Sequence, residues 1–391
     1  MLSTLKRLRL AVLRWVSAQL APRLDMALMQ PAPTPAGRLL AALSGLFVNK
    51  PLAESIVMGP LTFEIVRTAL NIGLFDRLHE KPGLTLPELS QALAVAIYPL
   101  EVILPALASL GMVHKIGDRY YDDPFLSLPL LAGANNDLLR KHFEYMHHVI
   151  APAGRFIQET VVENRPAGLH QLYGPVKDYY QRISLDETRR KYFYDFIGTY
   201  TQVNRDRVAA LPIFSRYQRI LDAGGNTGEM SLGIARHHPN ARVTVFDFPD
   251  TVAQASERIA ASGLGDRLDV LAGNFHQDGL PAGYDCILFS HFMEMLSPAD
   301  YQACLQRAFD RLPARGAVCV FTPVLADDET GPLTNAVISS YFMFLANGEG
   351  RIYSAKAIST WMEAVGFTSI ERHLLPMHEM VLVGTRPARA G

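Results

Sequence analysis

The sequence lacks the marks of several large classes of protein. Its three cysteines, Cys286, Cys304 and Cys319, have neither zinc-ligand spacing nor the pattern of a disulfide framework. No stretch offers the roughly 18 uninterrupted apolar residues that would indicate a transmembrane helix. A formal net charge of −1 gives no electrostatic reason to expect nucleic acid as a partner. We therefore expect buried thiols, no metal site and a cytoplasmic protein in a reducing compartment.

The length and composition predict a chain with a sizeable core. With 391 residues, of which 49% are hydrophobic, it has room for two domains or for one large domain with an extension. Changes in composition along the sequence suggest four regions. These are a basic amphipathic helix and linker, a winged-helix-like domain, a helical linker that contributes to a pocket, and a cofactor-binding domain: 1–50, 51–135, 136–212 and 213–391.

The first 24 residues carry positive charge and no acid. Their basic residues are Lys6, Arg7, Arg9, Arg14 and Arg23. On a helical wheel the apolar residues of this segment share one face. Three interpretations stay open: a helix that packs on a partner subunit, a helix that lies on anionic lipid, and a cleaved organellar transit peptide.

Residues 51–135 predict three helices followed by a β-hairpin. The helices are indicated by FEIVRTALNIGLFDRL, by LTLPELSQAL with Thr85 as its N-cap and Pro87 in its first turn, and by PLEVILPALASLGMV. The hairpin VHKIGDRYYDD turns at Gly117 and Asp118. This order is typical of a winged helix. The helix PLEVILPALASL is almost uncharged, so we expect a dimerisation role and not DNA binding.

Residues 136–212 predict helices rich in aromatic residues, and the pattern changes from Arg219 onward. Short apolar runs then alternate with helical segments, which predicts an α/β fold with a Rossmann-like parallel sheet and helices on both faces. The expected strands are RILDAG, RVTVFD, LDVLAG, YDCILFS and AVCVFT, and FTSIERHL and MVLVGT form a closing pair.

The first of these strands ends in the loop LDAGGNTGE, residues 221–229. Its glycine spacing, Gly224-Gly225-x-x-Gly228, differs from the dinucleotide pattern G-x-G-x-x-G. Asp222 would repel a pyrophosphate but suits a cationic ligand, and Asp247 ends the next strand, where an acid can bind both ribose hydroxyls. These features predict S-adenosylmethionine as the cofactor. Its candidate ligands are Asp222, Gly224, Gly225, Gly228, Asp247, Phe248, Asn274, Phe275 and Ser290.

Taken together, these motifs resemble the plant-type small-molecule O-methyltransferases, the family of caffeate and hydroxyindole O-methyltransferases. The resemblance covers about residues 60–386 and includes the winged-helix region, the glycine loop, FDFP, GNFH and NGEGRIYSAKAISTWMEAVGF. It implies a homodimer in which the N-terminal helices help to close the partner's pocket.

The same resemblance breaks down at the catalytic position. The family carries a general-base histidine after the fourth strand, but FMEML puts Glu294 there. The acids that accompany the histidine correspond to Thr322 and Gly350. Three mechanisms stay open: Glu294 as a base with a raised pKa, His291 as a base oriented by Glu294, or an acceptor that needs no strong base. The candidate catalytic residues are thus Glu294 and His291.

The sequence predicts an acceptor that is small, largely apolar and aromatic or conjugated, methylated at oxygen, carbon, nitrogen or sulfur. The expected pocket is rich in methionine and aromatic residues; its candidates are Met146, His147, His148, Phe193, Phe196, Tyr341, Met343 and Phe344. The alternative functions are a cofactor-binding enzyme that does not methylate, such as a hydroxylase, decarboxylase or cyclase, and a cofactor-binding scaffold.

Overall fold

The computed structural model describes residues 50–123, 137–177, 179–183 and 185–388. The segment 1–24 lies outside these residues, so the structure does not decide between its three interpretations. The chain divides into two compact units, of which the first ends at Ala132 and the second begins at Gly133. Each unit is described by itself below.

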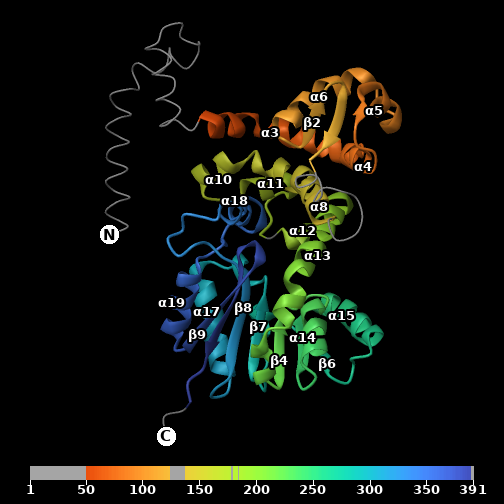
Figure 1. Cartoon of the computed structure of the whole chain (residues 1–391). Coiled ribbons are helices and arrows are strands. Elements are labelled where there is room, and N and C mark those ends of the chain that lie inside the picture. Colours follow the sequence, from red (N-terminus) through yellow and green to blue (C-terminus); the bar gives the residue numbers. More distant parts are fainter. Residues whose placement is uncertain (1–49, 124–136, 178, 184, 389–391) are drawn as a thin grey trace, which may run out of the picture. The chain divides into compact units, whose positions relative to one another are not determined.

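Over residues 50–123 the first unit has the expected winged-helix arrangement, with four helices and a small antiparallel sheet of order β1-β3-β2 (Figure 1). The helices are α3 (Lys50–Asn71), α4 (Leu74–Glu80), α5 (Leu86–Leu93) and α6 (Ile97–Ser109). The strands are β1 (Leu84–Thr85), β2 (Val113–Ile116) and β3 (Arg119–Asp122). Within the described ranges no single helix is long and apolar enough to cross a membrane, although the bent pair α5 and α6 meets the length and composition test together.

Local sequence signals explain most of these boundaries. Thr85 caps α5 through a capping box with Glu88, as its position predicts. The β2–β3 turn contains Gly117, whose φ is +63°, at the predicted place. One prediction was wrong: FEIVRTALNIGLFDRL is not one helix. Gly73 has a φ of +74°, a left-handed conformation that ends the regular spiral and separates α3 from α4.

The second unit contains a seven-stranded sheet of order β6-β5-β4-β7-β8-β10-β9. The first five strands in this order are parallel, whereas β10 runs antiparallel to both β8 and β9. The seven predicted strands are all confirmed. They are β4 (Arg219–Ala223), β5 (Arg242–Asp247), β6 (Leu268–Ala272), β7 (Cys286–Ser290), β8 (Ala317–Pro323), β9 (Thr368–Leu375) and β10 (Glu379–Thr385).

Helices cover both faces of this sheet, as predicted (Figure 1). One face packs on the last turn of α13 (Glu187–Ala209), on α14 (Glu229–His237) and on α15 (Pro249–Ser262). The other face packs on α17 (Pro298–Arg311) and α19 (Ala355–Val365). Cys286, Cys304 and Cys319 are buried free thiols within these layers.

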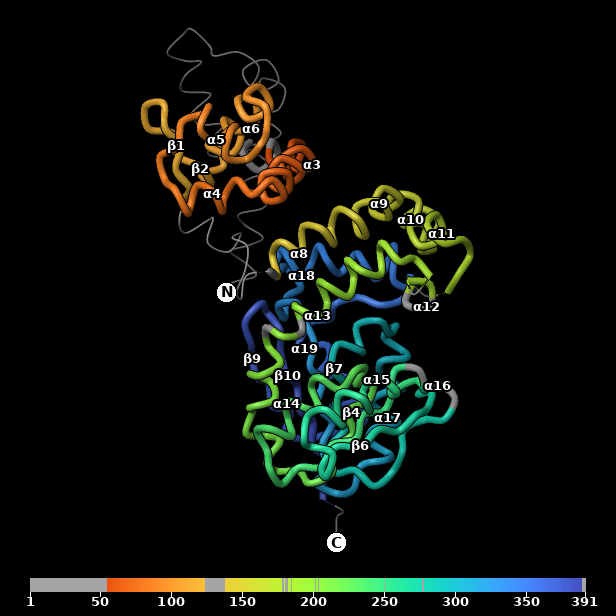
Figure 2. The backbone as a smooth tube through the Cα atoms, turned by 90° about the vertical axis from the view of Figure 1, so that its right-hand side faces the viewer, coloured from red at the N-terminus to blue at the C-terminus, as the bar shows by residue number. Residues whose placement is uncertain are grey.

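A layer of helices lies at one end of the sheet in both views (Figures 1 and 2). Besides α13 it contains α8 (Asp137–Tyr145), the π-helix η2 (Met146–Ile150), α9 (Ala151–Gly154), α10 (Ile157–Glu163), α11 (Ala167–Tyr173) and α12 (Tyr180–Ile183). The later segments α18 (Leu333–Ile338) and η5 (Phe342–Ala346) join the layer. Its apolar core is rich in aromatic residues and includes Tyr145, Tyr179, Phe193, Phe196, Tyr341 and Phe344.

Candidate functional site

The topology of the sheet marks the place for a ligand. Strand β4 pairs with β5 on one side and with β7 on the other, so the chain leaves β4 in one direction and later returns to its opposite edge. Loops that follow the carboxyl ends of such strands separate and leave a crevice for a ligand. The ends of β4, β5 and β7 and the loops after them hold most of the cofactor and catalytic candidates.

The loop after β4 is shaped by its glycines. Gly224 has a φ of +75°, and a Cβ there would lie 3.1 Å from the ring of Phe292. A Cβ on Gly225 would lie 2.7 Å from Cγ of Asp222. Gly228 has a φ of +77° and caps α14. Side chains would therefore fill the space through which a ligand approaches the backbone N–H groups and the start of the helix.

Asp222 is fully buried at the end of β4. Its Oδ2 accepts a 2.6 Å hydrogen bond from the hydroxyl of Ser231, and its Oδ1 has no hydrogen-bond partner among the described residues. Burial raises the pKa of Asp222 to about 6, although the hydrogen bond from Ser231 opposes the shift. A buried carboxylate with one free oxygen fits a nearby cationic ligand.

Asp247 ends β5 and faces the same loop. Its Oδ2 accepts a hydrogen bond from the backbone N–H of Asn226 at 2.9 Å, and its Oδ1 accepts one from Phe248 at 2.7 Å. Burial raises the pKa of Asp247. Each oxygen keeps acceptor capacity, so the carboxylate can still receive two ribose hydroxyls. The side chain of Phe248 beside it is 54% exposed, which leaves an apolar surface for a ligand.

The remaining cofactor candidates surround this loop from two other strand ends. Asn274 and Phe275 follow β6, and Ser290 is the last residue of β7. The ring of Phe275 lies 5.6 Å from that of Phe292, which in turn stacks on Phe289 at 5.8 Å. Phe292 packs against Gly224 and was missed by the sequence analysis, because one aromatic residue in an apolar run carries no signal of its own.

A charged cluster lies at the end of β7, and the two catalytic candidates form part of it. His291 leaves the strand with a φ of +49°, and its Nδ1 lies 3.4 Å from Oε1 of Glu294. Its Nε2 lies 3.2 Å from Oε1 of Glu379, the first residue of β10. The pairing of His291 with Glu294 is thus present, although the two residues do not share one regular helix. Glu379 is a second partner that the sequence analysis missed.

These two carboxylates determine the charge of His291. Burial alone would lower its pKa, but its contacts with Glu294 and Glu379 outweigh burial and raise the pKa to about 10. The same contacts lower the pKa of Glu379 against the effect of its own burial. At neutral pH His291 is therefore an imidazolium and Glu379 a carboxylate.

Neutral side chains complete this cluster. Oε1 of Glu294 accepts a 2.8 Å hydrogen bond from the hydroxyl of Thr322, and Oε2 of Glu379 accepts one of 2.5 Å from the side-chain amide of Asn204. Tyr200 lies near Glu379 and also helps to lower the pKa of this carboxyl group. At Gly350 no side chain fits, because a Cβ would overlap the carbonyl oxygen of Glu294. The carboxylate that the O-methyltransferases of the resemblance carry at this position therefore cannot be placed at Gly350 with the present backbone.

The predicted pocket residues belong to the aromatic helical layer. Phe193, Phe196, Tyr341 and Phe344 are buried within one cluster, with exposed fractions between 2% and 8%. Met146, His147, His148 and Met343 are half-buried. The structure therefore brings the buried four together as packed core, and a lining role for any of the eight stays a prediction.

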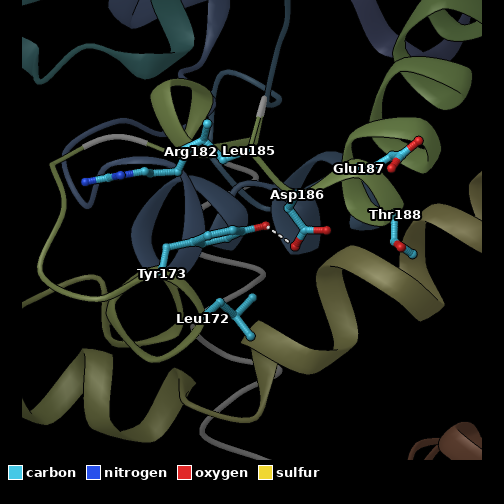
Figure 3. Close-up of a pocket in the computed structure, with 7 residues that line it drawn as sticks. All are labelled: Leu172, Tyr173, Arg182, Leu185, Asp186, Glu187 and Thr188. Atoms are coloured by element: carbon cyan, nitrogen blue, oxygen red, sulfur yellow. Dashed lines mark hydrogen bonds between the residues drawn. The ribbon is translucent and has the colours of Figure 1, made fainter.

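An open pocket of about 440 Å³ lies elsewhere in this layer (Figure 3). Its most prominent polar contact is internal, since the hydroxyl of Tyr173 donates to Asp186 at 3.3 Å. Asp186 also caps α13 and pairs with Arg189. These groups satisfy one another, so the pocket does not offer catalytic groups. Its lining is Leu172, Tyr173, Arg182, Leu185, Asp186, Glu187 and Thr188.

Comparison with known proteins identifies the family. The sequence model of the O-methyltransferase domain matches residues 155–368, which is more than half of the chain. The chain belongs to this family. It is a methyltransferase that depends on S-adenosylmethionine, and the glycine loop with Asp222 and Asp247 fits that cofactor by its shape and charge. The model of a Dimerisation2-like domain matches residues 50–120, which lie in the first unit.

Individual relatives of this methyltransferase are named for methylation at different atoms. The chain is 27% identical over 312 residues to the L-tyrosine C(3)-methyltransferase of Streptomyces lavendulae, covering 80% of this chain and 85% of that one. It is 27% identical over 319 residues to the 3-hydroxy-5-methyl-1-naphthoate 3-O-methyltransferase of Streptomyces sahachiroi, covering 82% and 90%. The N,N-dimethyltransferase OxyT of Streptomyces rimosus is 26% identical over 306 residues, covering 77% and 86%.

Solved structures share the fold. The apo form of the S-adenosylmethionine-dependent methyltransferase SibL superposes with a TM-score of 0.75 at 28% identity, covering 85% of this chain and 98% of that one. Human N-acetylserotonin methyltransferase in complex with its cofactor superposes with a TM-score of 0.69 at 20% identity, covering 92% and 100%. At that identity the second likeness concerns the fold alone.

Proposed function

We propose that this methyltransferase acts on a small, largely apolar acceptor that is aromatic or conjugated. The observation that carries the proposal is a series of ring contacts that joins the helical layer to the carboxyl edge of the sheet. Tyr145 stacks on Phe196 at 4.7 Å, Phe196 contacts Tyr200 at 5.6 Å, and Tyr200 lies 5.8 Å from His291. Aromatic groups therefore extend up to the charged cluster beside the cofactor loop.

The names of the relatives support the same acceptor class, because L-tyrosine and a hydroxynaphthoate are both aromatic. Relatives that methylate carbon, oxygen or nitrogen leave the acceptor atom of this chain open. They also favour methyl transfer over the two alternatives, a non-methylating enzyme and a scaffold. The roles of the cofactor and pocket candidates remain predictions. Glu294 and His291 are our candidates for contact with the acceptor.

We also infer that the enzyme acts as a homodimer in the cytoplasm. The Dimerisation2-like match supports dimer formation. Helix α3 exposes apolar side chains of the kind that a subunit interface covers, namely Ile56, Val57, Met58 and Leu61. Sedimentation of the full chain tests this inference, with twice the chain mass of 43.3 kDa as the expected result.

A turnover experiment tests the acceptor class. Purified protein is incubated with methyl-labelled S-adenosylmethionine and a panel of phenols, hydroxynaphthoates and aromatic amino acids. We expect one labelled methyl group in an aromatic product for each S-adenosylhomocysteine formed, and NMR of the product identifies the methylated atom. Cofactor binding without turnover on the whole panel would contradict the proposed acceptor class.

A further inference from the structure

Glu379 is the residue of the charged cluster that the family comparison does not explain. It is 1% exposed and begins β10, where it pairs with Pro323 of β8 in the sheet register. One of its oxygens faces His291 and the other accepts from Asn204 on α13. Glu379 therefore connects the closing strand, the histidine after β7 and the helical layer.

We propose that Glu379 is a positioning residue that, together with Glu294, fixes His291 as a permanent imidazolium, and that Oε2 of Glu294 receives an O–H or N–H group of the acceptor. The inference rests on the proposed function, because it names the chemical group by which that acceptor is recognised. It makes Glu294 the residue that contacts the acceptor and excludes His291 as the general base.

The surroundings of His291 favour two protons on its ring. A neutral imidazole has one N–H donor and one nitrogen that only accepts. Here both ring nitrogens lie near acidic oxygens, at 3.4 Å from Glu294 and 3.2 Å from Glu379, although the contact of Nε2 with Glu379 lacks the geometry of a hydrogen bond. Where both acids are ionised, only the imidazolium presents an N–H to each of them, and an imidazolium has no free lone pair with which to accept a proton from a substrate.

No further charged group opposes this arrangement among the described residues that act on His291. The titratable groups that face the cluster from the packed helices are Tyr200 on α13 and Tyr301 on α17. Burial, followed by the nearby carboxylates, raises the pKa of both phenols, so both stay neutral. The two acids outnumber the one basic group of the cluster, which disfavours an acceptor that places a carboxylate here.

Glu294 supplies the free acceptor atom of the cluster. Its Oε1 receives the hydroxyl of Thr322 and faces His291. No hydrogen bond to its Oε2 is formed by the residues that the structure describes, and the side chain is 5% exposed. This oxygen can therefore accept a hydrogen bond from a ligand that brings an O–H or N–H.

In this arrangement the cluster positions the acceptor in the site. A carboxylate next to an imidazolium is a weak base, but its hydrogen bond fixes the donor group of an aromatic ring and orients the neighbouring nucleophilic atom. A phenol or an aromatic amine carries such a donor. Methyl ethers and rings without a donor leave Oε2 of Glu294 unpaired and bind more weakly.

The first test reads the proton state of His291 without any acceptor. Protein with ¹⁵N-labelled histidine is saturated with S-adenosylhomocysteine and followed by NMR from pH 5 to 9, and H291N identifies the signal. We expect wild-type His291 to stay doubly protonated at pH 8, and Glu379→Gln to titrate nearer the ordinary value of about 6.5. Glu371→Gln is the matched control, because Glu371 pairs with Arg216 on the surface, away from the cluster. A neutral wild-type His291 at pH 7 would overturn the inference.

The second test asks whether Oε2 of Glu294 accepts a hydrogen bond from the acceptor. Binding of 1-naphthol and of 1-methoxynaphthalene is measured by calorimetry in the presence of S-adenosylhomocysteine. We expect wild type to bind 1-naphthol at least about tenfold more tightly, and Glu294→Leu to lose this preference while its affinity for S-adenosylhomocysteine stays unchanged. Equal binding of the two probes by wild type, or binding of neither, would overturn the role of Glu294.

The acceptor class and the role of Glu379 are tested by different outcomes. If the turnover panel yields no methylated aromatic product while His291 stays an imidazolium, the proposed acceptor class fails and the assignment of Glu379 stands. If an active enzyme shows a neutral His291, or if Glu379→Gln leaves its titration unchanged, this inference fails and the proposed function stands.

Discussion

The hydroxyl of Ser231 on α14 donates a 2.6 Å hydrogen bond to Oδ2 of Asp222 at the end of β4. This bond holds one oxygen of a fully buried carboxylate and leaves Oδ1 without a hydrogen-bond partner among the described residues. The relationship joins the strand before the glycine loop to the helix after it. The same bond therefore links the two elements that flank the loop and fixes a charge next to it.

The affinity for S-adenosylmethionine should depend on the ionisation of Asp222. Because its pKa is raised to about 6, the carboxylate is charged above that pH and neutral below it. We expect a constant affinity above pH 7 that falls as the pH decreases through 6. Ser231→Ala removes a hydrogen bond to the charged form, so its decline should begin at a higher pH. Calorimetry from pH 5 to 8 checks both curves, with the exposed Ser215→Ala as control. An affinity that stays flat to pH 5 would contradict the role of Asp222.

Removal of the Asp247 carboxylate should abolish retention of the cofactor. We expect Asp247→Ala to weaken binding of S-adenosylmethionine and S-adenosylhomocysteine by about a hundredfold, since each hydrogen bond to a charged group contributes about 1.5–3 kcal/mol. Asp269→Ala is the matched control, because Asp269 is an exposed carboxylate on the neighbouring strand β6. Unchanged retention in Asp247→Ala would argue against the cofactor site described here.

A single added methyl group in the glycine loop should block the approach of the cofactor to the loop backbone. Gly225→Ala would place a Cβ 2.7 Å from Cγ of Asp222, and overpacking of this kind costs about 1–3 kcal/mol. We expect weaker cofactor binding and a lower melting temperature. Gly265→Ala has nothing within 4 Å of the added Cβ and should leave both quantities unchanged. Equal behaviour of the two variants, measured by calorimetry and thermal unfolding, would show that the loop tolerates the side chain.

The charged cluster should stabilise the fold over a defined range of pH. The contribution from His291 is complete below its ordinary pKa of about 6.5 and is lost as the pH rises through 10. The contribution from Glu379, whose pKa is lowered, is present above its ordinary value of 4.5 and is lost as the pH falls through the lowered value. The loss of unfolding free energy in Glu379→Gln should therefore be largest near pH 5–6.5, at about 3 kcal/mol, and shrink towards pH 10. Urea unfolding at several pH values checks this, and a difference that grows with pH would contradict it.

Much of the fold followed from local patterns. Alternation of apolar runs with helical segments was enough to find all seven strands of the large sheet, and Thr85 with Pro87 marked the start of α5. The failure at Gly73 has a local cause too. Apolar spacing continues across Asn71 and Leu74, so hydrophobic periodicity did not reveal the left-handed glycine between α3 and α4.

The site was only partly predictable, because its decisive contacts are distant in sequence. The pairing of His291 with Glu294 was within reach of local spacing. Local spacing could not reveal the second partner of His291. Glu379 reaches His291 only because β10 inserts antiparallel between β8 and β9. An acid at the start of an apolar strand is an ambiguous signal in the sequence. Asn204 and Tyr200 come from a helix that precedes the sheet, and no motif links them to the edge that they contact.

The late position of β10 in the chain has a consequence for biosynthesis. A nascent chain that has emerged through β8 already contains the glycine loop, Asp247, His291 and Glu294, but it lacks Glu379 and the strand that carries it. Until β10 joins the sheet, His291 has one carboxylate partner and β8 has a free edge. The ribosome must therefore release almost the whole second unit before both carboxyl groups that contact His291 are in place.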